Sequence, residues 1–137
     1  MNLLERLNTS DRFANAIGAQ LVEIREGYAR AELTVGEKHL NGANVCQGGV
    51  MYTLADLAFA GVCNCHGTLT LGVNNSITFL KSGQLGEKII AEAVEVLDHH
   101  KLPYCEIKVR NEQGELLAVM TGLGYRLKKD FEFDSLM

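Results

Sequence analysis

One acidic side chain lies in the longest apolar stretch of the chain. Between Lys38 and Lys81 the only formally charged residue is Asp56, and the surrounding residues 50–63 are otherwise almost entirely apolar. A helix without a polar face is expected to be buried all round. An ionised carboxylate there is costly unless it is paired, protonated or open to a cavity. Asp56 is therefore a candidate general base, and the alternative is a buried Asp that is hydrogen-bonded to nearby backbone or hydroxyl groups.

A pair of glycines, Gly48 and Gly49, stands where this apolar segment is predicted to begin a helix. The first N–H groups of a helix have no intrahelical acceptor, and the helix dipole adds partial positive charge there. Such a terminus can stabilise a carbonyl oxygen that gains negative charge in a tetrahedral intermediate. The alternative is that the two glycines only permit a tight turn or close packing.

The spacing between these two features predicts an oligomer. Gly48 and Asp56 are eight residues apart, which is about 12 Å along one helix, so they cannot both contact one carbonyl carbon. A two-fold axis that lays two copies of the helix antiparallel would bring Gly48 of one chain near Asp56 of the other. If both residues act on one substrate, the protein is at least a dimer with its active site at the interface.

The predicted elements suggest how this helix is held. We expect a broken helix over residues 2–17, a hairpin over residues 20–35 that turns at Glu26-Gly27, and the central helix from Gly48 or Gly49 to about Cys65. Four alternating segments then predict a meander of strands, at residues 69–80, 88–98, 102–111 and 116–127. A sheet with one apolar face and an apolar helix cover each other if the sheet curls around the helix. The expected fold is α+β, a hotdog fold with a long central helix wrapped by a curved antiparallel β-sheet.

Length and composition limit the other possibilities. The 137 residues suit one domain with its core at about residues 10–128, and the net charge of −4 argues against a nucleic-acid surface. The start of the chain has no signal-peptide core, and the apolar helix is too short to span a membrane. We therefore expect a cytoplasmic protein. The last residues, 131–137, are expected to form a tail that frays or packs on a neighbour.

The cysteines predict no metal site. Cys63-Asn-Cys65 has the spacing C-x-C, and neither a second cysteine pair nor His66, His99 or His100 completes a zinc-binding pattern. Three of the four cysteines lie among apolar residues and are expected to be buried free thiols, as in a reducing cytoplasm: Cys46, Cys63 and Cys105.

The run from Asn41 through Gln47-Gly48-Gly49 to Asp56 closely resembles the hotdog-fold acyl-CoA thioesterases of the phenylacetate-degradation (PaaI-like) branch. The pattern there is roughly H-x-N-x-x-G-x-x-H-G-G, six residues, and then an acidic residue. The spacing from the glycine pair to the acid is the specific part. The segment Ile77-Thr-Phe-Leu-Lys81 resembles that family's F-L-[RK]-P strand end. The resemblance covers about residues 10–128.

The resemblance implies hydrolysis of an acyl- or aryl-CoA thioester, with no metal and no cofactor besides the coenzyme A of the substrate. Asp56 would activate water or attack the carbonyl, the Gly48 N–H would polarise the carbonyl, and Asn41 would hold loop and substrate in register. The protein would be a homo-oligomer. It would be at least a dimer, and we expect a tetramer that forms as a dimer of dimers. The alternatives are a non-catalytic acyl-CoA-binding hotdog protein and, ranked lower, an acyl-carrier hydratase or dehydratase.

The chain departs from the family pattern at three places. Gln47 stands where the family usually has His, and glutamine cannot take up a proton, so this position is expected to orient the loop or the carbonyl. Asn44 stands where Gly is common, and asparagine tolerates left-handed backbone. Gly72 lies near the position where relatives often carry a water-orienting Ser or Thr, and the sequence leaves three substitutes open: Asn74, Asn75 and Ser76.

Four further residues are candidates for substrate contact. Gly49 shares the helix start, and Tyr52 is either core or a wall of the acyl pocket. Lys81 would meet a phosphate of coenzyme A or is a solvated strand end. Lys101 belongs to the run His99-His100-Lys101, which is an exposed hairpin turn or a contact for the nucleotide phosphates. His39 matches the family motif, and a histidine satisfied by backbone groups is expected there.

Overall fold

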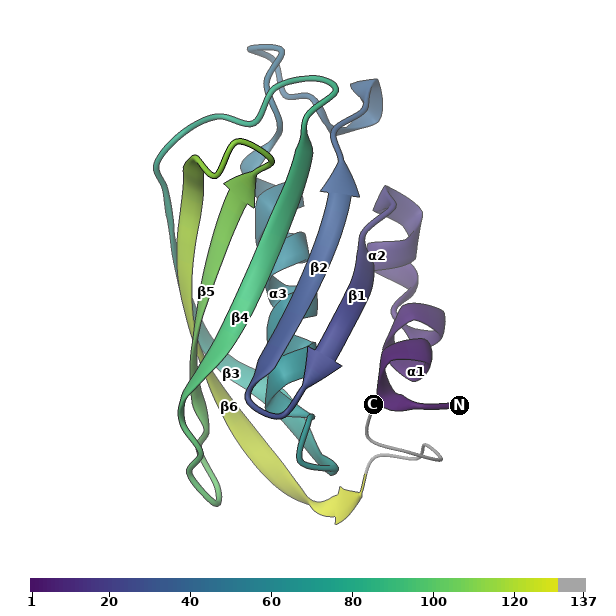
Figure 1. Cartoon of the computed structure of the whole chain (residues 1–137), viewed down its shortest axis with the longest axis vertical. Coiled ribbons are helices and arrows are strands. Elements are labelled where there is room, and N and C mark those ends of the chain that lie inside the picture. The colour runs from purple at the N-terminus through teal and green to yellow at the C-terminus, as the bar shows by residue number, and fades with distance from the viewer. Residues whose placement is uncertain (131–137) are drawn as a thin grey trace.

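The computed structural model describes residues 1–130, and the predicted tail over residues 131–137 lies outside the described part. Figure 1 shows a curved sheet around one long central helix, with two short helices beside the first strand. The expected α+β hotdog fold is confirmed. No helix in residues 1–130 has the length and apolarity needed to cross a membrane. The helices and strands are α1 (Leu3–Ser10), α2 (Arg12–Ile17), β1 (Gln20–Arg25), β2 (Tyr28–Thr34), the 3-10 helix η1 (Glu37–His39), α3 (Gly48–Cys63), β3 (Thr68–Phe79), β4 (Lys88–Leu97), β5 (Tyr104–Asn111) and β6 (Leu116–Asp130).

The sheet has the strand order β1-β2-β4-β5-β6-β3, and every neighbouring pair is antiparallel. The expected hairpins are present for β1–β2, β4–β5 and β5–β6. The prediction of a meander is wrong for β3, which pairs with β6 at the edge of the sheet, while β4 pairs with β2. Pairing between strands far apart in the sequence leaves no local turn signal, so alternation alone could not place β3.

Helix α3 is buried on all but one stripe. Its core residues include Leu54, Ala58 and Val62, which have no exposed surface. The prediction that this helix is buried all round is wrong for the residues that recur at helical spacing on its remaining face: Gly49, Tyr52, Thr53, Asp56 and Ala60, which are half-buried or exposed. We call this the open face of α3. Asp56 therefore lies on the surface of the single chain instead of within its core.

Two glycines set the distance between α3 and the sheet. A Cβ atom at Gly61 would lie 2.9 Å from the Cβ of Ala29 on β2, and one at Gly122 on β6 would lie 2.8 Å from the Phe59 ring. Both distances are shorter than van der Waals contact, so a larger residue would force the helix away from the sheet. The close approach lets the Phe59 ring pack directly against the backbone of β6 at Gly122.

The two edges of the sheet differ. At β1, the Asn8 side chain donates to the Leu21 carbonyl at 2.9 Å and accepts from the Leu21 N–H at 2.8 Å, so part of this edge is covered by the N-terminal helices. The edge of β3 has no such cover within residues 1–130, and two of its apolar side chains, Leu71 and Val73, are more than half exposed. Long exposed edge strands are usually protected or paired with another chain.

Candidate active site

The start of α3 offers one free backbone donor. Gln47 is the N-cap, and its side-chain oxygen accepts from the Gly49 N–H at 2.7 Å. The Val50 N–H donates to the Gln47 carbonyl at 2.9 Å. Within residues 1–130 the Gly48 N–H has no acceptor, as expected for the first residue of a helix. Gly48 is thus the donor that a ligand can use, and Gln47 organises the helix start.

A cavity of about 320 Å³ opens beside this donor, and three of the predicted site residues line it: Asn41, Gly48 and Lys81. The Asn41 side-chain oxygen accepts from the backbone N–H groups of Ala43 and Val45, at 2.9 and 3.3 Å, which fixes the loop. Its amide N–H groups have no acceptor in the described residues and can donate to a ligand. Asn41 can therefore serve both loop and substrate, as the resemblance implied.

Phe79 forms the opposite wall of this cavity. A Cβ atom added to Gly48 would lie 3.0–3.4 Å from the Phe79 ring, so only glycine lets the ring cover the helix start closely. The ring is an apolar surface next to a free N–H donor. This combination suits a ligand with a carbonyl group and an apolar neighbour.

Asp56 forms a second cluster, together with Asn75 of β3 and Tyr52. The Asn75 amide donates to the Asp56 carboxylate at 3.3 Å and to the Tyr52 hydroxyl at 3.0 Å. The Asn75 side-chain oxygen is buried and has no hydrogen-bond partner in the described residues. Of the three residues that the sequence left open near Gly72, Asn75 is the one that contacts Asp56. Tyr52 lies half-buried on the open face, packed against the edge of the core, and its hydroxyl accepts from Asn75.

The electrostatics of this cluster favour a base. Burial against the helix–sheet layer raises the pKa of Asp56 above its ordinary value, although the residue is exposed to solvent on one side in the single chain. The hydrogen bond from Asn75 lowers this pKa, and the negative charge of Asp11 raises it further. A carboxylate with a raised pKa is a stronger base than an ordinary aspartate. No hydrogen bond from backbone or hydroxyl groups to this carboxylate occurs within residues 1–130, so the structural alternative for Asp56 is not supported.

The two clusters are separate within one chain. Asp56 does not line the cavity at Gly48, and eight helical residues place them about 12 Å apart. The geometric premise of the sequence argument is therefore met, since both residues belong to α3.

The two predicted lysines also lie apart. Lys81 pairs with Glu115 at the wall of the cavity. Lys101 lies in the turn between β4 and β5, with its ammonium group 5.5 Å from the centre of the Tyr125 ring. It lines a basic cavity of about 470 Å³ with His100, Arg126 and Lys128. Arg126 lies opposite Thr70, near the start of β3, whereas Phe79 is nine residues further along, about 30 Å away.

Several smaller predictions are confirmed. The His39 ring is buried between the Gly36 N–H, at 2.8 Å, and the Ile17 carbonyl, at 2.7 Å, so backbone groups occupy both nitrogens. Asn44 adopts a left-handed backbone with φ of 61°. All four cysteines are buried free thiols.

Comparison with known proteins agrees with this geometry. The sequence model described as the thioesterase superfamily matches residues 43–118. A provisionally named esterase of Archaeoglobus fulgidus is 43% identical over 122 residues, covering 89% of this chain and 79% of the relative. The acyl-coenzyme A thioesterase PaaI of Escherichia coli is 31% identical over 118 residues, covering 86% of this chain and 84% of the relative.

The solved structure of the E. coli PaaI protein superimposes with a TM-score of 0.88 at 29% identity, covering 92% of this chain and 91% of that one. The fold and the helix-start site define a hotdog-fold thioesterase. The chain belongs to the thioesterase superfamily and to its PaaI-like branch, as the sequence resemblance indicated.

Proposed function

We propose that this thioesterase hydrolyses acyl- or aryl-CoA thioesters at a site shared by two copies of the chain. One observation carries the proposal: a free N–H donor in a cavity, at Gly48, and a carboxylate with a raised pKa, Asp56, lie on one helix but are too far apart to act on one carbonyl. The name of the E. coli relative, an acyl-coenzyme A thioesterase, supports the substrate class.

The edge of β3 supports a two-fold arrangement. Asn75 of β3 contacts Tyr52, which lies midway between Gly48 and Asp56 on α3, so the middle of the strand lies at the height of Tyr52. A two-fold axis at this height pairs β3 with its copy and lays the two α3 helices antiparallel. It covers the exposed apolar side chains of β3 and brings Gly48 of one copy toward Asp56 of the other. Pairing of such dimers into a tetramer stays a prediction.

The reaction then needs few groups. Asp56 takes a proton from a water molecule, whose oxygen attacks the thioester carbonyl carbon. The carbonyl oxygen becomes negatively charged and accepts a hydrogen bond from the Gly48 N–H, which already points toward that position. When the intermediate collapses, the carbon–sulfur bond breaks, the acid product forms, and the coenzyme A thiolate takes up the proton from Asp56.

Asn75 and Gln47 act as positioning residues in this scheme. The amide of Asn75 holds the Asp56 carboxylate, and its unpartnered oxygen is an acceptor beside that base, suited to orient the attacking water. The side chain of Gln47 caps the helix and leaves the Gly48 N–H free. This role requires no proton transfer, so glutamine in place of the family's histidine is compatible with catalysis.

The basic cavity at Lys101 fits the same arrangement. Antiparallel pairing of β3 sets the start of one strand beside the end of its copy, so the Lys101 cavity of one chain lies on the side of its partner's helix start. We propose that Lys101 contacts the nucleotide phosphates of coenzyme A there, since the ammonium groups of Lys101 and Lys128 attract such anions, whereas Arg126 is paired with Asp98. Gly49 and Tyr52 border the bound thioester from the open face. The free thiols are consistent with the cytoplasm.

Mixing two inactive variants tests the shared site. Asp56→Asn removes the base and Gly48→Pro removes the donor, and a hybrid dimer of the two has one site with neither defect. After dissociation and reassociation of a 1:1 mixture, we expect about a quarter of the wild-type thiol release, because half of the dimers are hybrids with one intact site of two.

Each variant reassociated with itself is the control. A mixture that is no more active than the controls contradicts a shared site. Wild-type protein that binds acyl-CoA tightly but releases no thiol from aryl-, short- or long-chain esters contradicts hydrolysis and supports the non-catalytic alternative.

A further inference from the structure

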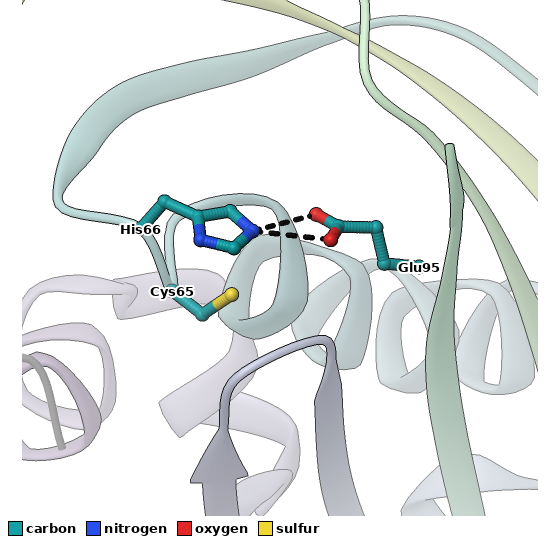
Figure 2. Close-up of side chains that lie close together, drawn as sticks. All are labelled: Cys65, His66 and Glu95. Carbon is teal, nitrogen blue, oxygen red and sulfur yellow. Dashed lines mark hydrogen bonds and ion pairs between the residues drawn. The ribbon is translucent and has the colours of Figure 1, made fainter. Parts of the chain in front are cut away.

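A group of possible metal ligands lies at the far end of α3, apart from the proposed catalytic groups. Figure 2 shows the Cys65 and His66 side chains, from the turn that follows α3, close to Glu95 of β4. The Cys65 sulfur, one His66 ring nitrogen and one Glu95 oxygen lie within 4.8 Å of one another. Cys65 follows Asp56 by nine residues, about 13 Å along the helix direction.

The distance between two of the three ligands is already close to the one that a tetrahedral site requires. The His66 Nε2 atom lies 3.0 and 3.1 Å from the two Glu95 oxygens. Ligand bonds of about 2.0–2.3 Å place neighbouring ligands of tetrahedral zinc about 3.3–3.6 Å apart. The His66–Glu95 edge therefore already has nearly the required length, and the Cys65 sulfur, within 4.8 Å of the other two ligand atoms, needs to approach by about 1.5 Å at most. Side-chain rotation supplies such a movement.

A further carboxylate lies next to His66, outside the group of three. The Asp98 carboxylate lies 3.6 Å from His66 Nε2 and is half exposed, so the site is open to ions from solvent. We propose that Cys65, His66, Glu95 and Asp98 bind a divalent ion of the zinc class. A thiolate, an imidazole and two carboxylates form a mixed set of sulfur, nitrogen and oxygen ligands, which suits a borderline-soft ion better than magnesium or calcium.

Charge balance supports the site. Arg126 contacts Asp98 at 2.6 Å and Glu95 at 3.8 Å, so the two carboxylates are held in place when no ion is bound. With a bound dication, the three negative ligands are balanced by the ion and the Arg126 guanidinium, and His66 is neutral. Buried charges are tolerated when they are compensated in this way.

The backbone of Gly27 holds two of the proposed ligands in place. The Gly27 N–H lies 3.4 Å from the sulfur and its carbonyl accepts from the Glu95 N–H at 3.0 Å, so one residue outside the ligand set orients two ligands.

The bound ion would join three parts of the chain. It connects the turn after α3 with the end of β4 and, through Gly27, with the β1–β2 turn. Sequence reasoning missed the site because His66 and Glu95 are 29 positions apart and no short cysteine–histidine spacing marks it. Binding releases the thiol proton of Cys65 to solvent, so affinity increases with pH.

Titration of the reduced wild-type protein with Co²⁺ tests the proposal, because cobalt replaces zinc and reports a thiolate ligand through a charge-transfer band. We expect one Co²⁺ per chain with this band, and its loss when Zn²⁺ is added. Cys65→Ser abolishes the band, whereas the matched control Cys46→Ser, another buried thiol, retains it. Absence of the band, or its persistence in Cys65→Ser, overturns the proposal.

A second variant covers failure of Cys65→Ser to fold. His66 is partly exposed and its replacement by alanine leaves the core intact. We expect His66→Ala to weaken Co²⁺ binding at least about tenfold, and Zn²⁺ to raise the melting temperature of the wild type but not of this variant. Equal affinity in His66→Ala and wild type, or an equal Zn²⁺-induced shift of the melting temperature, overturns the assignment.

Discussion

The buried face of α3 and its open face both contain small residues, but they differ in their other side chains. The buried face packs alanine, leucine and phenylalanine against the sheet, and Gly61 allows contact with β2. The open face carries Asp56 and Tyr52 among small residues, and these two share Asn75 as a partner. The two faces therefore have different roles: one completes the core of its own chain, and the other carries the polar groups of the proposed site.

The largest expected effect is a loss of folding stability when the buried face is changed. Ala58→Asp places a carboxylate where no surface is exposed, and an uncompensated buried charge costs about 3–5 kcal/mol or more, a large part of the stability of a small domain. We expect loss of the cooperative thermal transition. Ala60→Asp, the same change on the open face, is the matched control and is expected to keep the fold. Equal effects in circular dichroism would show that the two faces do not differ.

The next effect concerns the base on the open face. Asp56→Asn keeps the shape of the side chain but cannot take a proton from water, so kcat/KM is expected to fall by between about 10² and 10⁴. Glu112→Gln, which neutralises an exposed turn carboxylate, is the control and should leave thiol release unchanged. An Asp56→Asn enzyme within a few-fold of the wild type would exclude Asp56 as the base.

The helix start permits a test of the N–H group alone. Proline is well tolerated at the first position of a helix, and the Gln47 backbone, with φ of −65° and ψ of 138°, is compatible with a following proline. Gly48→Pro removes the donor, so we expect a decrease in kcat of about 10². Gly48→Ala adds the same Cβ against Phe79 and keeps the N–H, and should be clearly more active. Similar rates for the two variants would assign the loss to crowding.

The smallest effect is a pH-dependent gain in stability. Because the folded-state pKa of Asp56 is raised, its protonated form favours folding at acidic pH, and this contribution is lost as the pH rises through the raised pKa. We therefore expect Asp56→Asn to melt slightly higher than the wild type near pH 7, and at the same temperature below about pH 4. A lower melting temperature at pH 7 would contradict the desolvation of this carboxylate. The same raised pKa shifts the acidic limb of the wild-type kcat/KM profile above the ordinary aspartate value.

The sequence predicted local features well and long-range features poorly. The helix from Gly48, the turn at Gly27 and the left-handed Asn44 follow from local chemistry, and the structure contains all three. The edge position of β3 and the contact of Asn75 with Asp56 depend on pairing between distant segments, which periodicity does not encode.

Burial of Asp56 was predicted wrongly for a physical reason. Apolar composition around α3 does not distinguish a face that contacts its own sheet from one that points away from it. Hydropathy reports that a surface avoids water, and it does not identify the partner that covers it.

The contact of Gly122 with Phe59 limits how this enzyme can be improved. Strand propensity alone would favour valine at that position of β6, but a branched side chain there would lift the helix and tilt Asp56 away from Asn75. Efforts to obtain a more heat-resistant variant by consensus or propensity rules should therefore leave this glycine unchanged. A residue with higher strand propensity would stabilise the strand but misalign the Asp56 carboxylate.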